Sequence, residues 1–238
     1  MNRRESLVTL AGSALGGVGA TAGCASVAQS EDSRMVIDDG VTDITPVYVM
    51  TYTDGQPTVF VRANYYFFDA KKQVQLRVGG SIKVNGNLLK HDPQTLTSYI
   101  GNISMPSELL TFEFTRATGQ VSRHSFALPK LEVVAYPTQY SADGPVRIAV
   151  SPGAVRKGVM EDSYNMTIFG PTGESRFVGE SEGQSQLRFR SVQMSALPTG
   201  SYRAFIYRQQ RSALKDISDY KTGWAIASRT HNFVIEVV

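Results

Sequence analysis

Short runs of residues that favour extended backbone dominate this sequence. They are rich in Val, Ile, Tyr, Phe and Thr, and turn residues such as Asp54-Gly55, Gly79-Gly80 and Thr118-Gly119 separate them. The runs span 47–53, 58–68, 73–78, 81–89, 97–103, 109–115, 120–128, 131–135, 146–150, 164–170, 176–179, 186–194, 201–209 and 230–237. Regularly spaced short strands with such turns predict an all-β protein, a sandwich or a barrel. Outside the N-terminal segment, only 214–220 could form a turn or two of helix.

Two runs carry specific information about pairing. Asn85-Gly86 lies between Val84 and Asn87, and this dipeptide tolerates the positive φ angles of a two-residue hairpin turn. In the run 58–68 both alternating faces are largely apolar, which indicates a central strand or one covered on both sides. Its aromatic stretch, 65–68, is typical of core packing; the alternative is a platform for a sugar.

The chain contains a single cysteine, Cys24, near its start. Because the remainder has no cysteine, its apolar core must stabilise it without disulfides. The length of 238 residues is sufficient for two domains. Pro129-Lys130 separates the two sets of strands, and we expect a first β-sandwich domain at 45–129 and a second at 130–238. The fold class is therefore two tandem antiparallel β-sandwich domains after a signal segment and a tether.

The segment Leu197-Pro198-Thr199-Gly200-Ser201-Tyr202 resembles the tyrosine corner of immunoglobulin-like and fibronectin-like domains. The resemblance covers 131–238 and is stronger in its second half. It implies an immunoglobulin-like sandwich in which Tyr202 begins the penultimate strand and its hydroxyl bonds back to the corner. The position of Trp224 near the last strand, with no cysteine present, excludes an antibody-type domain.

The first 23 residues have the features of an export signal. A short charged start containing Arg3-Arg4 precedes a mildly apolar, Gly- and Ala-rich stretch that is too short and too weak to span a membrane. The paired arginines resemble a bacterial twin-arginine signal, although Ser6 stands where that family has a large apolar residue. Twin-arginine export and general secretion both stay open.

Thr21-Ala22-Gly23-Cys24 resembles the lipobox of bacterial lipoproteins, with Thr21 in place of the usual aliphatic residue. The resemblance implies acylation of Cys24, membrane attachment through lipid, and outer-membrane sorting because Ala25 follows the cysteine. The alternative is cleavage after Ala28, which would give a soluble periplasmic or secreted protein. We expect a signal segment at 1–23 and a lipidated tether at 24–44, whose acidic residues read as solvated linker.

Charge and motifs point away from several classes of function. The net charge of +3 does not suggest nucleic-acid binding. Gly179-Glu180-Ser181-Glu182-Gly183 matches the nucleophile elbow of hydrolases, with His231 later in the chain. That motif is meaningful only on a strand-to-helix turn, whereas here it lies between two β runs. We therefore predict no enzyme and no catalytic residues.

The histidines are too widely spaced to form a local ligand set. His91, His124 and His231 lie in different runs or loops, and none is one helical turn or one strand pair from another. We predict no metal site and no cofactor.

What remains is a binding role. The connection 209–223 carries Arg211, Lys215 and Tyr220, and Trp224 follows it. Aromatic side chains beside charged groups suit a protein interface, and the other reading is a hairpin tip without a partner. A second candidate is the outward face of run 201–209, with Arg203, Phe205 and Tyr207 outward and Tyr202, Ala204 and Ile206 inward. We expect a non-catalytic envelope lipoprotein that binds another envelope protein; the alternative is a carbohydrate-binding module whose glycan contacts include Tyr65 or Trp224.

Overall fold

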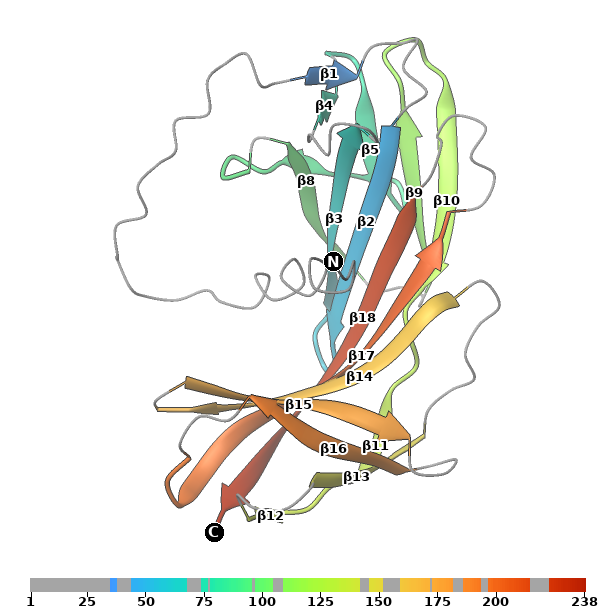
Figure 1. The fold of residues 1–238 in the computed structure, drawn as a ribbon. Helices are drawn as coiled ribbons and strands as arrows, with labels where there is room; N and C mark the ends of the chain where they lie inside the picture. Colours follow the sequence, from blue (N-terminus) through green and yellow to red (C-terminus); the bar gives the residue numbers. More distant parts are fainter. Residues whose placement is uncertain are drawn as a thin grey trace, which may run out of the picture. The chain divides into compact units, whose positions relative to one another are not determined.

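The computed structural model describes residues 35–37, 44–67, 74–76, 78–95, 97–104, 109–141, 146–151, 159–171, 173–181, 186–193, 197–214 and 223–238. The chain divides into two compact units, Met1–Ser33 and Arg34–Val238, and every described residue belongs to the second. All regular elements among these residues are β-strands (Figure 1). The predicted all-β class is confirmed. No helix among the described residues is long and apolar enough to cross a membrane.

The strands form two sheets that contain the core residues and one small two-stranded pairing. They are β1 (Met35–Ile37), β2 (Ile44–Thr53), β3 (Thr58–Phe67), β4 (Val74–Leu76), β5 (Ser81–Val84), β6 (Asn87–Leu88), β7 (Lys90–His91), β8 (Ser98–Ser104), β9 (Leu109–Thr115), β10 (Val121–Ala127), β11 (Glu132–Ala135), β12 (Gln139–Tyr140), β13 (Val146–Ser151), β14 (Val159–Gly170), β15 (Gly173–Ser181), β16 (Gln186–Gln193), β17 (Gly200–Ala213) and β18 (Trp224–Val237). The large sheet has the order β11-β13-β16-β15-β14-β17-β18-β2-β3-β8-β7, with β12 beside β18. The small sheet has the order β10-β9-β5-β6, and β1 pairs with β4.

The hairpin between β5 and β6 turns at Asn85-Gly86, as the sequence predicts. Asn85 has φ 49° and Gly86 has φ 81°, the left-handed conformation that this pair tolerates. The Asn85 side chain also reaches the neighbouring strand: Thr111 N donates to its Oδ1 at 2.8 Å, and its Nδ2 donates to Leu109 O at 3.2 Å. One turn residue therefore fixes both the hairpin and its register against β9.

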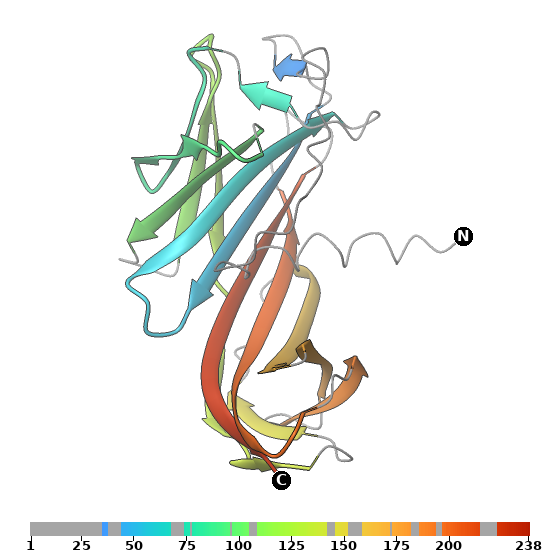
Figure 2. The ribbon, with the colours of Figure 1, turned by 90° about the vertical axis from the view of Figure 1, so that its left-hand side faces the viewer.

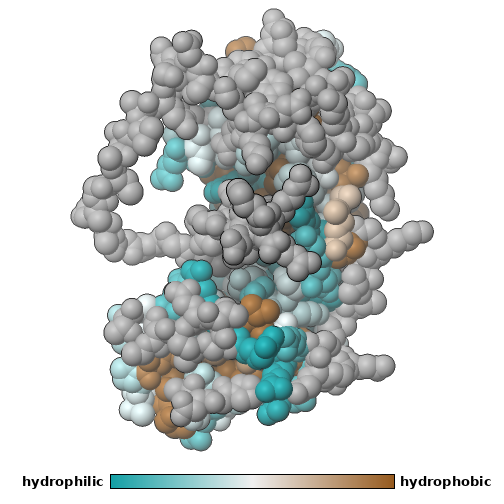
Figure 3. All heavy atoms as spheres, viewed as in Figure 1, coloured by the Kyte–Doolittle hydropathy of each residue, from teal (hydrophilic) through white to brown (hydrophobic). Residues whose placement is uncertain are grey.

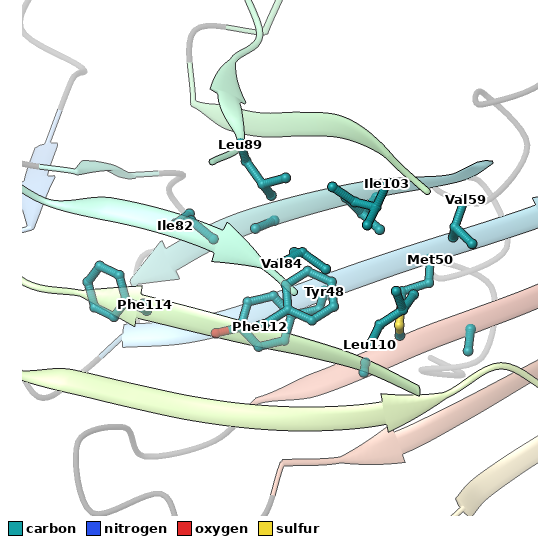
Figure 4. Close-up of a cluster of buried hydrophobic side chains, with 14 of the residues drawn as sticks. Tyr48, Met50, Val59, Ile82, Val84, Leu89, Ile103, Leu110, Phe112 and Phe114 are labelled. Atoms are coloured by element: carbon teal, nitrogen blue, oxygen red, sulfur yellow. The ribbon is translucent and has the colours of Figure 1, made fainter. Parts of the chain in front are cut away.

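The first core lies between the small sheet and the β2-β3-β8 part of the large sheet (Figure 4). The rings of Tyr48 on β2 and Phe112 on β9 stack across the two layers at 4.3 Å. Tyr65 on β3 is fully buried and packs against Phe114 at 5.2 Å. β3 lies between β2 and β8, so the prediction of a central strand is confirmed, and Tyr65 serves the core rather than a sugar platform. The two sheets form a β-sandwich.

The second core lies within the β11–β18 part of the large sheet. Its buried members come from β12, β13, β14, β15, β16, β17 and β18 and from Leu131. Tyr140 on β12 meets Phe177 on β15 edge-to-face at 5.9 Å. The hydroxyl of Tyr202 donates to Pro198 O at 2.8 Å, the bond that the tyrosine corner predicts.

β18 contributes to both cores, and it pairs along its whole length with β17, whose own buried apolar residues belong to the second core (Figures 1 and 2). Their register runs from Gly200 opposite Val237 to Ala213 opposite Trp224, and both strands extend well beyond the predicted runs 201–209 and 230–237. The first half of β18 pairs in parallel with β2, which brings Ala225 and Ala227 into the first core. Ala, Ser and Arg residues dilute the apolar alternation of 224–229, so periodicity misses this part of the strand. The predicted division at residue 130 stays a prediction, although the first core includes residues from beyond it.

A polar layer separates the two cores along the inward face of β17 and β18. Arg208 and Arg229 lie opposite each other in the register, between the alanines of the first core and Phe233 of the second. Arg208 is 1% exposed. It donates to both carboxylate oxygens of Asp162, at 2.9 and 2.6 Å, and to Lys130 O at 2.9 Å. The positive charge of Arg208 is thus neutralised within the fold.

The second half of the polar layer joins β18 to the turn after β2. Arg229 Nε donates to Asp54 Oδ1 at 2.8 Å, and His231 Nδ1 lies 3.3 Å from Asp54 Oδ2. The backbone N of Asp54 donates to Thr230 O at 2.8 Å. The Arg229 guanidinium lies over the Tyr52 ring, with its Cζ 5.3 Å from the ring centre. These contacts join the end of β2 to the middle of β18, where β18 passes from the first core to the second.

Candidate interaction surfaces

Two of the predicted partner-binding residues contact each other. The guanidinium of Arg211, near the end of β17, lies 4.7 Å from the ring centre of Trp224, the first residue of β18. Arg211 also pairs with Glu161 of β14 at 3.3 Å. The side chains of Arg211 and Trp224 are both half-buried. The other two predicted residues, Lys215 and Tyr220, lie outside the described residues, as does Cys24.

The predicted loop 209–223 is shorter than expected, because β17 continues to Ala213. Leu214 N donates to Gly223 O at 3.0 Å, and Leu214 belongs to the first core. A Cβ on Gly223 would lie 3.0 Å from both the ring and the carbonyl oxygen of Pro46 and would collide with Leu214. Leu214 and Gly223, which flank 215–222, are therefore packed tightly against the first core.

A more exposed surface lies on the outward side of the second core. We call it the Phe205 face and define it by the residues Phe169, Val178, Phe205, Tyr207 and Val234. Strand register places them on one side: Asn165 lies opposite both Val178 and Tyr207, Thr167 lies opposite Phe205, and Arg203 lies opposite Phe169 and Val234. Ala204 and Ile206, which alternate with them on β17, are fully buried. The predicted inward and outward residues of run 201–209 are confirmed.

The Phe205 face exposes large apolar side chains. Phe169 is 38% exposed, Val178 41% and Val234 54%. Phe169 and Phe205 meet edge-to-face at 5.1 Å, the preferred geometry of an aromatic pair. An antiparallel sheet with one face on a core normally presents polar residues on the other. Figure 3 shows hydrophobic and hydrophilic residues side by side over the strands of the second core.

Charged groups lie among these apolar side chains. Arg176, beside Thr167 in the register, pairs with Glu174 at 2.8 Å. Burial raises the pKa of the Tyr207 hydroxyl, the positive charge of Arg176 lowers it, and Glu174 raises it. Tyr207 is therefore a neutral hydrogen-bonding group with an apolar ring at neutral pH. Such amphipathic aromatic residues are common in protein interfaces.

Sequence reasoning identified only the β17 part of this face. Phe169, Val178 and Val234 come from β14, β15 and β18, and each sits in a run where a single outward apolar residue is unremarkable. Only the strand order β15-β14-β17-β18 places them together. The indication that the sequence offered was that each of these residues falls on an outward-facing position of its own strand.

The nucleophile-elbow motif and the histidines do not form a site on this surface. Gly179, Glu180 and Ser181 lie in β15, which pairs antiparallel with β16, and not on the strand-to-helix turn that the motif requires. His231 lies beside Asp54 in the polar layer, and His124 is buried near Tyr48. Among the described residues, no three His, Cys, Asp or Glu side chains are grouped to hold a metal ion.

The fold defines an all-β protein with a β-sandwich architecture whose two apolar cores share one long strand, β18. No family model matches the chain, and no curated protein matches it. Among solved structures, the chain is similar to the extracellular region of plexin A4 at 7% identity, with a TM-score of 0.26. The match covers 78% of this chain and 27% of the plexin chain.

Proposed function

We propose that this protein is an exported bacterial envelope lipoprotein that binds another protein through the Phe205 face. The observation that supports the proposal is the set of exposed apolar side chains on one outward side of four neighbouring strands. Contiguous apolar surface in water is costly, and on folded proteins it commonly marks an interaction site. The lipid on Cys24 would hold the domains at the membrane, and the binding role is non-catalytic.

The rigidity of the face supports this role. Its central strands, β14 and β17, are hydrogen-bonded on both sides, and the residues between the exposed ones are buried in the second core. Aromatic side chains on a rigid scaffold lose little conformational freedom on binding, so more of their burial contributes to affinity. Burying one Phe side chain fully contributes about 1.5–3 kcal/mol.

Site-specific photo-crosslinking in cells that produce the protein tests this proposal. A photoreactive phenylalanine analogue replaces Phe205 in one variant and Val134 in the control. Val134 is 65% exposed and lies on β11, away from the Phe205 face. We expect a discrete crosslinked protein from position 205 and none from position 134. Equal crosslinking from both positions, or none from 205, would reject the proposal.

A further inference from the structure

Arginine predominates over acidic residues on and around the Phe205 face. The outward positions of β13, β14, β15, β16, β17 and β18 carry six arginines and four glutamates: Arg147, Arg176, Arg188, Arg190, Arg203, Arg211, Glu161, Glu174, Glu180 and Glu236. Registers connect them across the sheet: Arg147 lies opposite Arg188, Arg188 opposite Glu180, and Arg190 opposite Val178. Six arginines of the described strands therefore share one side with the exposed apolar residues.

The glutamates neutralise only part of this charge. Glu174 pairs with Arg176, and Glu180 pairs with Arg190. Arg203, which lies between Phe169 and Val234, is exposed and has no ion pair among the described residues. The Nε of Arg188 is buried and makes no hydrogen bond there. Donors with unused capacity thus lie within the Phe205 face, at Arg203, and beside it, at Arg188 on β16.

The direct opposition of Arg147 and Arg188 adds to the positive potential. The two residues are register partners on β13 and β16. Arginine forks bind carboxylates through two parallel hydrogen bonds, and they also stack on aromatic rings. The chemistry that complements this side is carboxylate groups next to aromatic or aliphatic side chains.

We infer that the partner of the Phe205 face is an acidic protein segment that combines carboxylates with aromatic side chains; this rests on the proposed function. The apolar centre takes the partner's aromatic groups, and Arg203 and Arg188 take its carboxylates. A second copy of this chain fits less well, because the two opposed faces would both carry excess arginine.

The probe is a random copolymer of glutamate and tyrosine, added to the purified full-length chain in detergent, with binding measured by fluorescence anisotropy. A lysine–tyrosine copolymer controls for aromatic content and heparin for negative charge alone. We expect the glutamate–tyrosine copolymer to bind, with affinity that falls as salt is raised. The affinity should weaken about tenfold in Arg203→Glu, since the charge that faces the copolymer's carboxylates is reversed. Lys90→Glu makes the same charge change on exposed β7 and should bind as the wild type does.

The outcomes separate this inference from the proposed function. Equal binding of both tyrosine copolymers, or unchanged affinity in Arg203→Glu, overturns the acidic partner. Stronger binding to heparin that survives Phe205→Ser also overturns it, because a sulfated glycan would then be the ligand. If the crosslink from position 205 still forms in cells carrying Arg203→Glu, the protein-binding function stands and only the acidic partner fails.

Discussion

Arg208 and Asp162 form a bidentate ion pair inside the fold, with the Arg208 side chain 1% and the Asp162 side chain 15% exposed. Arg208 also donates to Lys130 O, so it joins β14 and β17 to the segment that links the two sets of strands. Its guanidinium lies 5.2 Å from the ring centre of Tyr164. Burial lowers the pKa of Arg208, but the hydrogen bonds to Asp162 and the nearby Tyr164 raise it by more. The net effect is a pKa above the usual value for arginine. The charge is therefore retained and satisfied within the protein.

Removing one partner of this pair should be strongly destabilising. Asp162→Asn leaves a buried guanidinium without its counter-ion, which costs about 3–5 kcal/mol of unfolding free energy. Urea denaturation followed by circular dichroism measures the change. The control is Glu161→Gln, which breaks the Arg211 ion pair on the same two strands. Because Glu161 is 67% exposed, its loss should cost about 0–1 kcal/mol. Equal losses in the two variants would contradict the buried role of Asp162.

Tyr164 should make the protein less stable at alkaline pH. Burial raises its pKa from 10.0 to about 12, Arg208 lowers it and Asp162 raises it. The unfolded chain loses this proton near pH 10, whereas the folded chain keeps it until about pH 12. The contribution of Tyr164 to the unfolding free energy is therefore fully present below that window and is lost as pH rises through it. Denaturation across the window should give a shallower fall in Tyr164→Phe, and identical slopes would contradict the assignment.

Gly223 should tolerate no side chain. An added Cβ would lie 3.0 Å from the Pro46 carbonyl oxygen, which belongs to the strand backbone and cannot move away cheaply. We expect Gly223→Ala to destabilise the first core by about 1–3 kcal/mol. Gly101→Ala is the matched control: its Cβ would meet the tip of the flexible Leu89 side chain at 2.9 Å. Thermal denaturation should show the larger loss for Gly223→Ala, and the reverse order would refute the tight approach.

Membrane attachment should depend on Cys24. We expect Cys24→Ser to release the protein from the membrane fraction, because no acylated sulfur remains to insert into the bilayer. Mass spectrometry of the wild-type N-terminal peptide should show an acylated cysteine. Ala28→Leu, which removes the alternative cleavage site, should leave attachment unchanged. A wild-type chain that begins at Gln29 with unmodified mass would exclude the lipid anchor.

Local patterns predicted much of the fold because each depends on neighbours in sequence. The strand positions follow from β-branched and aromatic content, the hairpin at Asn85 follows from its left-handed conformation, and the Tyr202 bond spans only four residues. The candidate site was predicted in part: alternation identified Phe205 as outward. The loop between Gln209 and Gly223 was predicted too long, because polar residues of β17 do not look like strand.

The sequence by itself determined the all-β class, the inward and outward residues of the run 201–209, and the turn at Asn85-Gly86. Only the tertiary structure decided that β18 pairs with β2, that Arg208 meets Asp162, and that Phe169, Val178 and Val234 join Phe205 on one side. These contacts join residues far apart in the chain, and many strand orders satisfy the same local alternation. The order that forms is the one in which both arginines of the polar layer find carboxylates while the two apolar cores close on either side.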